Sequence, residues 1–403
     1  LNIIDAPGLF DFAGGVSEAL AAADSAVIAV SGKSGLTTGA KQSFQKARAL
    51  KKAVAFFVGK LDSSHAHFYR VISSLVANYG AVICPVVIPY IENDEVKSYI
   101  DLITNKAYAC DGLELKELRM PVSNEADEMR SMLLEAIATA DDALMEKYFA
   151  GEEFTPEEII EGLKKGVTAG EICPVFAGVQ QTGAAVPLMV DTLLQILPSA
   201  ADAVCRFEDG EEKAFDENGE NALFVFKTIA DPFVGKLSYF RVLSGKIKND
   251  TRLINNRTGA EERLSKIMWL KGGKQEDAGE IIAGDIGSVS KLGNVLTGDT
   301  LSASGKLAAA AVDFPAPTIS VAVYPKAKGD EEKITQAFSR LCEEDPTIKV
   351  YTDNETHEQI LSALGEQHID VIISRLKSKF GAEVELKKPK IAYRETIRKP
   401  VKG

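Results

Sequence analysis

Along the first quarter of the chain, short apolar runs alternate with amphipathic segments. Short apolar runs predict strands, and apolar residues at three- and four-residue spacing predict helices. Strands that alternate with helices indicate βαβ units and a mainly parallel sheet. The predicted strands are Leu1–Asp5, Ser25–Val30, Val54–Val58 and Val82–Ile88, and the predicted helices are Ser17–Ala23, Ala40–Leu50 and His67–Tyr79.

An acidic segment interrupts this alternation. Residues 111–165 hold 15 Asp and Glu against six Lys and Arg, and their Leu, Met and Ile residues recur at helical spacing. A strand, Pro174–Gly178, and a helix, Ala185–Leu197, then resume the α/β pattern. We therefore predict a partial α/β domain over 1–106, an acidic helical insert over 107–167 and the end of the same domain over 168–199.

The second half of the chain predicts two further domains. Residues 207–313 contain short β runs separated by Gly, Asn and Asp, which is typical of a small β-barrel. Residues 316–388 follow a β-α-β-β-α-β order, the split βαβ arrangement of ferredoxin-like folds. The barrel strands are Leu223–Thr228, Leu237–Leu243, Gly245–Ile247, Thr251–Ile254 and Ile286–Ser290, and the later elements are Thr318–Pro325, Asp330–Glu344, Ile348–Thr352, Glu358–Ala363, Glu366–Phe380 and Val384–Leu386. The fold class is multidomain: α/β, β-barrel and α+β.

Charge and composition narrow the function. The net charge of −12 over 403 residues argues against indiscriminate nucleic-acid binding and against DNA as a partner. Residues 371–403 nevertheless hold ten Lys and Arg and three acids, which fits either a solvated helix face and tail or an RNA-facing end. Five scattered cysteines without a CxxC motif indicate a reducing, cytoplasmic setting. The longest apolar stretch, Ala81–Ile91, is too short to cross a bilayer, so no membrane is expected.

Asp5-Ala6-Pro7-Gly8 is the sharpest local motif and directly follows a predicted strand. An Asp at the carboxyl end of a parallel strand lies where open α/β sheets bind ligands. In P-loop nucleotidases such an Asp holds Mg²⁺ and the glycine backbone approaches the γ-phosphate. An ordinary strand-ending turn has the same composition, so the motif alone decides nothing.

Gly59-Lys60-Leu61-Asp62 gives a second signal after the apolar run 53–58. The Lys60 stem suits the face of a guanine ring, and the Asp62 carboxylate suits the paired N–H donors at its edge. A loop with two solvated charges is the simpler alternative. Two such loops on successive strand ends of one sheet favour a guanine-nucleotide site.

Two other motifs give little evidence of function. Gly32-Lys33-Ser34 resembles the end of a phosphate loop, but Val27 stands where the pattern needs glycine, so Lys33 is predicted to be a surface residue. No other GxxxxGK[ST] motif exists in the chain. The histidines form no constellation for nucleophilic or metal chemistry and are interpreted as structural: His65, His67, His357 and His368.

Taken together, these motifs resemble those of the translational GTPases, and specifically of elongation factor G, over essentially the whole chain. Residues 2–8 with Asp11-Phe12 resemble the third G motif of that family, Lys60-Leu61-Asp62 the fourth, and 174–178 the strand that delivers the fifth. Further similar segments follow in order: 146–148 and 151–153 in the insert; 231–237, 241–242, 244–245, 283–286 and 297–300 in the barrel; and 343–346, 365–366, 368–370 and 389–397 in and after the third domain. Residues 389–403 would begin a fourth domain.

The resemblance implies a cytoplasmic, monomeric GTPase that binds GTP, GDP and Mg²⁺ and acts on the ribosome in translocation or a related step. Asp5 would hold Mg²⁺ through water and Gly8 would sense the γ-phosphate. Lys60 and Asp62 would read guanine, with the loop Gly178, Val179 and Gln180 beside them. The acidic insert would meet the ribosomal stalk protein, and the barrel and third domain would face ribosomal RNA and proteins.

The chain departs from the family pattern at four places. Leu9 stands where the family has the histidine that orients the attacking water, so this chain offers no catalytic residue there. Gly59 replaces an asparagine, and Val179-Gln180 replaces Ser-Ala, where a backbone N–H would keep the guanine contact. The chain starts at Leu1 without a phosphate loop, which we interpret as truncation.

We therefore expect an elongation-factor-G-like parent GTPase and a 403-residue chain that does not hydrolyse GTP by itself, because catalysis of this kind depends on phosphate positioning. A non-catalytic ribosome-binding protein that has lost nucleotide dependence is the alternative from another class. A ribosome-protection factor that confers antibiotic resistance would share the same domains.

Overall fold

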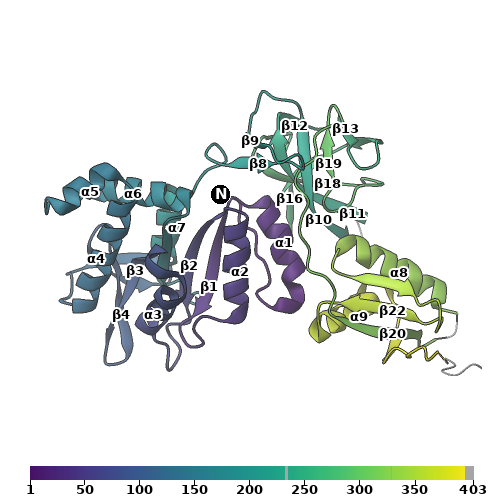
Figure 1. Cartoon of the computed structure of the whole chain (residues 1–403), viewed down its shortest axis with the longest axis horizontal. Coiled ribbons are helices and arrows are strands. Elements are labelled where there is room, and N and C mark those ends of the chain that lie inside the picture. Colours follow the sequence, from purple (N-terminus) through teal and green to yellow (C-terminus); the bar gives the residue numbers. More distant parts are fainter. Residues whose placement is uncertain (232–234, 328, 395–403) are drawn as a thin grey trace, which may run out of the picture. The chain divides into compact units, whose positions relative to one another are not determined.

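The structure is a computed structural model that describes residues 1–231, 235–327 and 329–394. It divides into two compact units, one over residues 23–203 together with Leu1, and one over residues 2–22 and 204–403. Each unit is described separately below (Figure 1).

The first unit is built on a seven-stranded sheet in the order β1-β2-β7-β3-β4-β5-β6. β1, β2, β7 and β3 run parallel, and β3 to β6 form an antiparallel meander. Every residue of β2 and β7 is buried, as expected for central strands covered on both faces. The strands are β1 (Ser25–Ser31), β2 (Ala53–Gly59), β3 (Ile83–Glu92), β4 (Glu95–Asp101), β5 (Lys106–Asp111), β6 (Glu114–Leu118) and β7 (Cys173–Ala177).

Helix α6 (Pro156–Ala169) of the first unit begins and ends at residues that the sequence marks clearly. Thr155 caps α6 with a reciprocal capping box to Glu158, Pro156 opens the helix, and Gly170 ends it in a left-handed conformation. α4, α5 and α6 lie together on the β3 side of the sheet (Figure 1). The helices are α2 (Thr38–Ala49), α3 (Phe68–Tyr79), α4 (Asn124–Thr139), α5 (Asp142–Phe149), α6 (Pro156–Ala169) and α7 (Val186–Ile196), with a 3-10 turn, η2 (Gly80–Val82).

Three predictions for this region need correction. Residues 1–8 form no strand although they lie in the described part of the chain; they pair with no described strand, and an apolar run without a ladder partner leaves its backbone unpaired. The sheet is mixed rather than mainly parallel. The segment 107–167 is not wholly helical, because it contains most of β5 and all of β6, which a two-residue hairpin turn at Gly112 and Leu113 joins.

The second unit begins with η1 (Phe10–Phe12) and α1 (Ala13–Ala22) and continues with an eight-stranded antiparallel sheet. Leu264 and Ile267 come from opposite ends of its strand order yet share one buried cluster with Leu223 and Phe240. The sheet therefore curls around this cluster, as the barrel prediction requires. Its strands are β10 (Ala222–Asp231), β11 (Gly235–Ser244), β13 (Thr251–Asn255), β14 (Glu261–Leu264), β15 (Ile267–Lys271), β16 (Lys274–Asp277), β18 (Ile286–Ser290) and β19 (Thr300–Ser302), with two small sheets from β8 (Val204–Arg206), β9 (Glu212–Ala214), β12 (Lys246–Lys248) and β17 (Glu280–Ile282).

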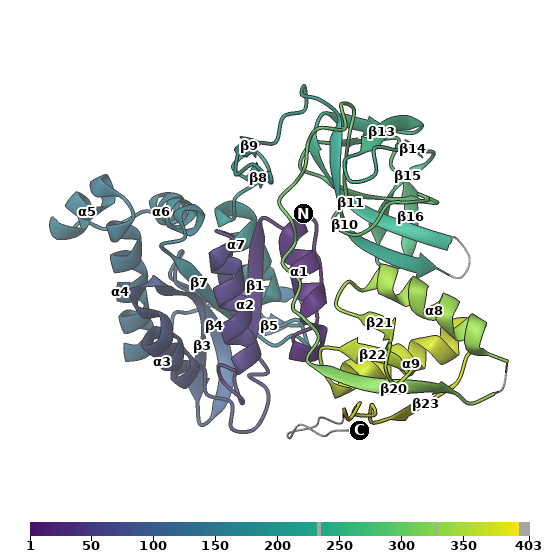
Figure 2. The same cartoon turned by 45° about the vertical axis from the view of Figure 1, so that its right-hand side comes forward.

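The last part of the second unit is a four-stranded antiparallel sheet in the order β21-β22-β20-β23 with two helices (Figure 2). One apolar cluster, which includes Phe338 and Leu376, joins the helices to the sheet. The order and positions of the six predicted elements are confirmed. They are β20 (Ile319–Pro325), α8 (Glu331–Glu344), β21 (Lys349–Thr352), β22 (Gln359–Ala363), α9 (Glu366–Phe380) and β23 (Val384–Lys387).

Candidate functional site

Three loops of the first unit leave the carboxyl edge of its parallel strands side by side. Ser31 of β1 pairs in register with Gly59 of β2, and Val58 of β2 pairs with Ala177 of β7. The loops after these strands therefore begin at one edge, where open α/β sheets bind ligands. The structure thus brings together five of the predicted site residues: Lys60, Asp62, Gly178, Val179 and Gln180.

The loop after β2 presents two charged side chains around a buried anchor. Leu61 is 8% exposed, whereas Lys60 and Asp62 on either side of it are exposed to solvent. The Gly59 carbonyl accepts a hydrogen bond from the Gly32 N–H at 2.8 Å, which fixes the loop against the end of β1. Burial of Leu61 keeps both charges at the open edge of the sheet.

The loop after β7 is closed by its own backbone. The Gly178 N–H donates to the Val58 carbonyl at 3.1 Å, and the Val179 N–H donates to the Ala184 carbonyl at 3.0 Å. Since the Val179 N–H is used within the loop, the Gln180 N–H is the remaining candidate for the predicted backbone contact with guanine. The Gln180 side chain also takes part, because its Oε1 accepts from the Lys60 N–H at 3.0 Å.

The predicted phosphate-facing residues lie elsewhere. Asp5 and Gly8 belong to the second unit, where both are exposed. The idea that they follow a strand of the same sheet as Lys60 is therefore wrong, and their roles at the nucleotide stay predictions. Leu9 comes next, with its side chain 57% exposed.

Gly32-Lys33-Ser34 forms a tight turn and not a phosphate cradle. The Ser31 hydroxyl accepts from the Lys33 N–H at 3.2 Å and from the Ser34 N–H at 3.3 Å. The following helix, α2, begins only at Thr38, after its own cap at Thr37. Lys33 is exposed, as predicted.

Sequence reasoning missed Asp11 as a structural link within the second unit. The Asp11 carboxylate accepts from the Gln367 N–H at 3.0 Å and the His368 N–H at 3.4 Å, so it caps the N-terminus of α9. His368 is 3% exposed, and its Nε2 lies 3.0 Å from Asp345 Oδ2. His368 is therefore a core residue, in agreement with the structural interpretation of this histidine.

The basic carboxyl-terminal segment is largely neutralised where the structure describes it. Lys377 pairs with Glu383 at 2.8 Å and Lys379 with Glu344 at 2.8 Å. These pairs favour a solvated, internally paired surface over an RNA-facing one. Part of the basic segment lies outside the described residues, namely Glu395, Arg398, Lys399 and Lys402, together with residues 396–397 of the family motif. Pro232, Phe233 and Val234 of the barrel motif also lie outside the described residues.

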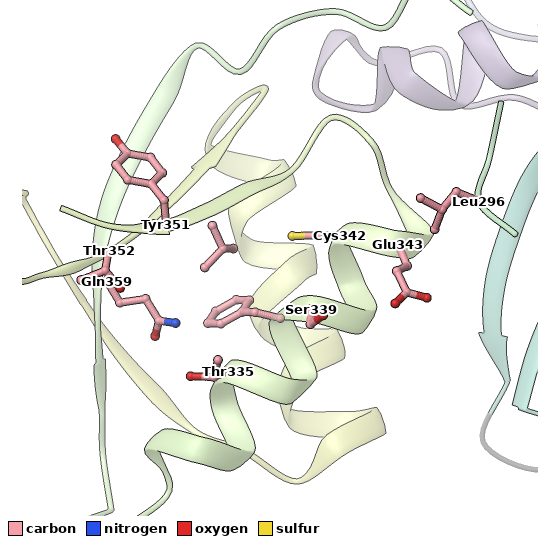
Figure 3. Close-up of a pocket in the computed structure, with 10 residues that line it drawn as sticks. Leu296, Thr335, Ser339, Cys342, Glu343, Tyr351, Thr352 and Gln359 are labelled. Atoms are coloured by element: carbon pink, nitrogen blue, oxygen red, sulfur yellow. The ribbon is translucent and has the colours of Figure 1, made fainter. Parts of the chain in front are cut away.

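A groove of about 490 Å³ on the second unit is the other candidate binding site. Figure 3 shows Cys342 and Glu343 of α8 on one side and Tyr351 and Gln359 on the other. Burial raises the pKa of the Cys342 thiol, which disfavours the nucleophilic thiolate, and Glu343 already pairs with Lys236 at 3.0 Å. The side chains that line this groove thus offer fewer free polar groups for ligand binding than those at the strand edge of the first unit. Within the described residues, no group of three or more His, Cys, Asp or Glu is arranged to hold a metal ion.

Comparisons with known proteins show the family of the chain. The model for the elongation factor Tu GTP-binding domain matches residues 1–199, that for elongation factor G domain 2 matches 220–304, and that for elongation factor G domain III matches 314–388. The chain belongs to the elongation-factor-G-like translational GTPases. Lys60, Asp62 and Gly178–Gln180 lie inside the GTP-binding domain of this family.

A solved structure supports the same assignment. A protein from Thermus thermophilus is 31% identical with a TM-score of 0.85, and the match covers 98% of this chain. The chain spans 58% of the length of that protein. In the described parts of the chain, no helix is both long and apolar enough to cross a membrane.

Proposed function

We propose that this chain forms the guanine-reading and ribosome-facing part of an elongation-factor-G-like GTPase that acts in translocation or a related ribosomal step. The observation that carries the proposal is the meeting of the loops after β2 and β7 at one strand edge, joined by the Lys60–Gln180 hydrogen bond. The Lys60 stem would cover the ring face of guanine. The Asp62 carboxylate would accept from the ring N–H and the amino group.

Asp5 suits the predicted magnesium role. Magnesium in nucleotide sites keeps several water ligands beside the phosphates of the substrate, so an exposed carboxylate can hold the ion through one of these waters. Asp5 would bind a water ligand of the ion, and the Gly8 backbone would approach the γ-phosphate. The bound ion would neutralise phosphate charge.

We expect the 403-residue chain by itself to be inactive in GTP hydrolysis. It contains no GxxxxGK[ST] motif, and phosphoryl transfer in this class depends on positioning of the phosphates. Leu9 also offers no hydrogen bond to orient water.

The partners would be ribosomal RNA and ribosomal proteins. The acidic helices α4, α5 and α6 would meet the stalk protein, and the barrel and third domain would face the ribosome. We expect a cytoplasmic monomer with no membrane and no DNA partner.

The first experiment measures binding of fluorescent GDP, GTP and ATP, with and without Mg²⁺, by a full-length protein that carries this chain. We expect GDP and GTP to bind and ATP to be excluded. Asp62→Asn replaces an acceptor by a donor, so it should weaken GDP and favour xanthosine diphosphate, whose ring carries an oxygen in place of the amino group. Binding of no nucleotide would overturn the proposal and leave a ribosome-binding scaffold.

Leu9 favours the non-catalytic alternative, since a leucine cannot position water. Ribosome-stimulated hydrolysis by the wild type and by Leu9→His separates the two functions. Hydrolysis that rises in the variant supports a working nucleotide site without its usual histidine. Nucleotide binding with no hydrolysis in either protein would favour the non-catalytic ribosome-binding role.

A further inference from the structure

The loop that carries Lys60 is held in a conformation that its own residues do not favour. Lys60 has φ = +57°, in the left-handed region that side chains other than glycine adopt at a cost of roughly 1 kcal/mol. Such a residue persists only when its surroundings fix it. The Lys60 N–H donates to Gln180 Oε1 at 3.0 Å across 120 residues of sequence, so Gln180 supplies one of the contacts that fix it.

Gly59 makes room for this contact. A Cβ atom at residue 59 would lie 2.6 Å from Gln180 Oε1 and 3.0 Å from Phe57 Cε1. The Gln180 amide therefore fills the space that a side chain on residue 59 would enter. Gly59 and Gln180 therefore fit each other. The side-chain amide that supports the Lys60 loop comes from residue 180, after β7, and not from residue 59 at the end of β2.

The loop that delivers Gln180 is itself well supported. Gly183 donates its N–H to the Val179 carbonyl at 2.9 Å, and Val179 and Ala184 pair as an isolated bridge. Leu113, from the β5–β6 turn, packs so closely on Gly183 that a Cβ there would lie 2.8 Å from its Cδ2. The hydrogen bonds within this loop and the packing of Leu113 against it hold the Gln180 backbone in place.

We propose that Gln180 is a positioning residue for guanine: its amide holds the Lys60–Asp62 loop in the conformation that reads the base, in place of a side chain on residue 59. The inference rests on the proposed function, because it concerns the same nucleotide site. The Gln180 side chain acts on the base through Lys60 and Asp62, and its effect should appear in base discrimination as well as in affinity.

The test measures the dissociation constants of GDP and inosine diphosphate for the full-length protein that carries this chain. Inosine lacks the amino group that Asp62 would accept from, so the ratio of the two constants reports the placement of Asp62. We expect Gln180→Ala to weaken GDP about tenfold, as for loss of one hydrogen bond, and to lower the preference for GDP over inosine diphosphate. Gln180→Glu keeps the acceptor oxygen and should retain more of the preference.

Residue 59 provides the decisive comparison. Gly59→Asn alone should weaken GDP binding, because the new Cβ would clash with Gln180 Oε1. The double variant Gly59→Asn with Gln180→Ala should bind GDP more tightly than the single variant Gln180→Ala. Gln181→Ala, an exposed neighbour in the same loop, is the matched control and should leave both constants unchanged. Thermal melts without nucleotide identify any variant that fails to fold.

The outcomes separate this inference from the proposed function. A wild type that binds no guanine nucleotide overturns the function. A wild type that binds GDP, with a Gln180→Ala variant of unchanged nucleotide preference, overturns the role of Gln180 alone. A variant with lower thermal stability but unchanged preference shows a purely structural role and also overturns the inference.

Discussion

The carboxylate of Asp299 is buried in the second unit and accepts four hydrogen bonds. Asn255 Nδ2 and Arg257 Nε each donate at 2.7 Å, and Arg257 Nη2 and the Leu296 N–H each donate at 2.9 Å. Burial raises the pKa of Asp299, but the hydrogen bonds from Arg257, Leu296 and Asn255 outweigh it and hold the pKa below its usual value. A buried charge is stable here because both carboxylate oxygens accept hydrogen bonds, one at Oδ1 and three at Oδ2.

We predict that Asp299→Ala lowers the free energy of unfolding of the second unit by about 3 kcal/mol at neutral pH, because it leaves the buried Asn255 amide and the Leu296 N–H without their acceptor. The stabilisation from a lowered carboxyl pKa is complete above the unfolded-state value, about 3.9, and is lost as pH falls through the lower folded-state value. The difference between wild type and variant should therefore shrink in acid. Urea unfolding followed by the fluorescence of Trp269, the single tryptophan, measures this difference in the free energy of unfolding.

Glu261→Ala is the matched control for that prediction. Glu261 pairs with Arg252 at 2.8 Å, but both side chains are more than half exposed. Surface pairs of this kind contribute little, so the change should stay within about 0.5 kcal/mol. Equal effects for Asp299→Ala and Glu261→Ala would show that the buried hydrogen bonds of Asp299 add no stability.

At the scale of elements, α9 obtains its N-terminal cap from a distant segment. Its N-cap residue, Gly365, has no side chain to cap the helix, and Asp11 accepts from the N–H groups of Gln367 and His368 instead. A Cβ at residue 365 would lie 2.3 Å from Asp11 Oδ2. The glycine is thus required by the approach of Asp11, although serine is the better cap in ordinary helices.

We predict that Gly365→Ser destabilises the second unit in the wild type, by about 1 kcal/mol or more, because its Cβ displaces Asp11. In an Asp11→Ala background the same substitution should be stabilising, since the serine hydroxyl then supplies the missing cap. Thermal unfolding of the wild type, the two single variants and the double variant gives the coupling free energy between residues 11 and 365. The same sign for Gly365→Ser in both backgrounds would refute the idea that Asp11 is the cap.

At the scale of the whole molecule, charge is acidic on balance and locally paired. The net charge is −12, and described basic residues near the carboxyl end lie beside carboxylates, as Lys377 lies beside Glu383 and Lys390 beside Glu358. A paired cation adds little to long-range attraction of phosphate. Ribosome binding by such a chain would depend on specific surfaces and not on general attraction to RNA.

We predict that the chain shows no measurable affinity for unstructured RNA at about 150 mM salt, where exposed charges are screened beyond roughly 8 Å. Fluorescence anisotropy with a labelled single-stranded RNA checks this. The triple variant Glu355→Gln, Glu358→Gln and Glu383→Gln removes carboxylate partners of Arg394, Lys390 and Lys377 and should bind RNA better. Salt-sensitive binding by the wild type would restore the RNA-facing interpretation of this end.

The sequence by itself determined what is local. Helix α9 has the predicted bounds, and α3 and β20 begin one residue from theirs, because periodicity and capping residues act within a few positions of the chain. The loop that we propose reads guanine was also visible in the sequence, since Lys60 and Asp62 directly follow an apolar strand.

Only the tertiary structure decided what depends on distant partners. The apolar run at Leu1–Asp5 has no ladder partner among the described residues and forms no strand, whereas the weaker pattern over Glu114–Leu118 forms one, because a hairpin turn brings it to β5. Gln180 reaches Lys60 across 120 residues and Asp11 reaches Gln367 across 356. A hydrogen bond between residues so far apart leaves no periodic trace in the chain, so it becomes visible only when the fold has placed the two groups together.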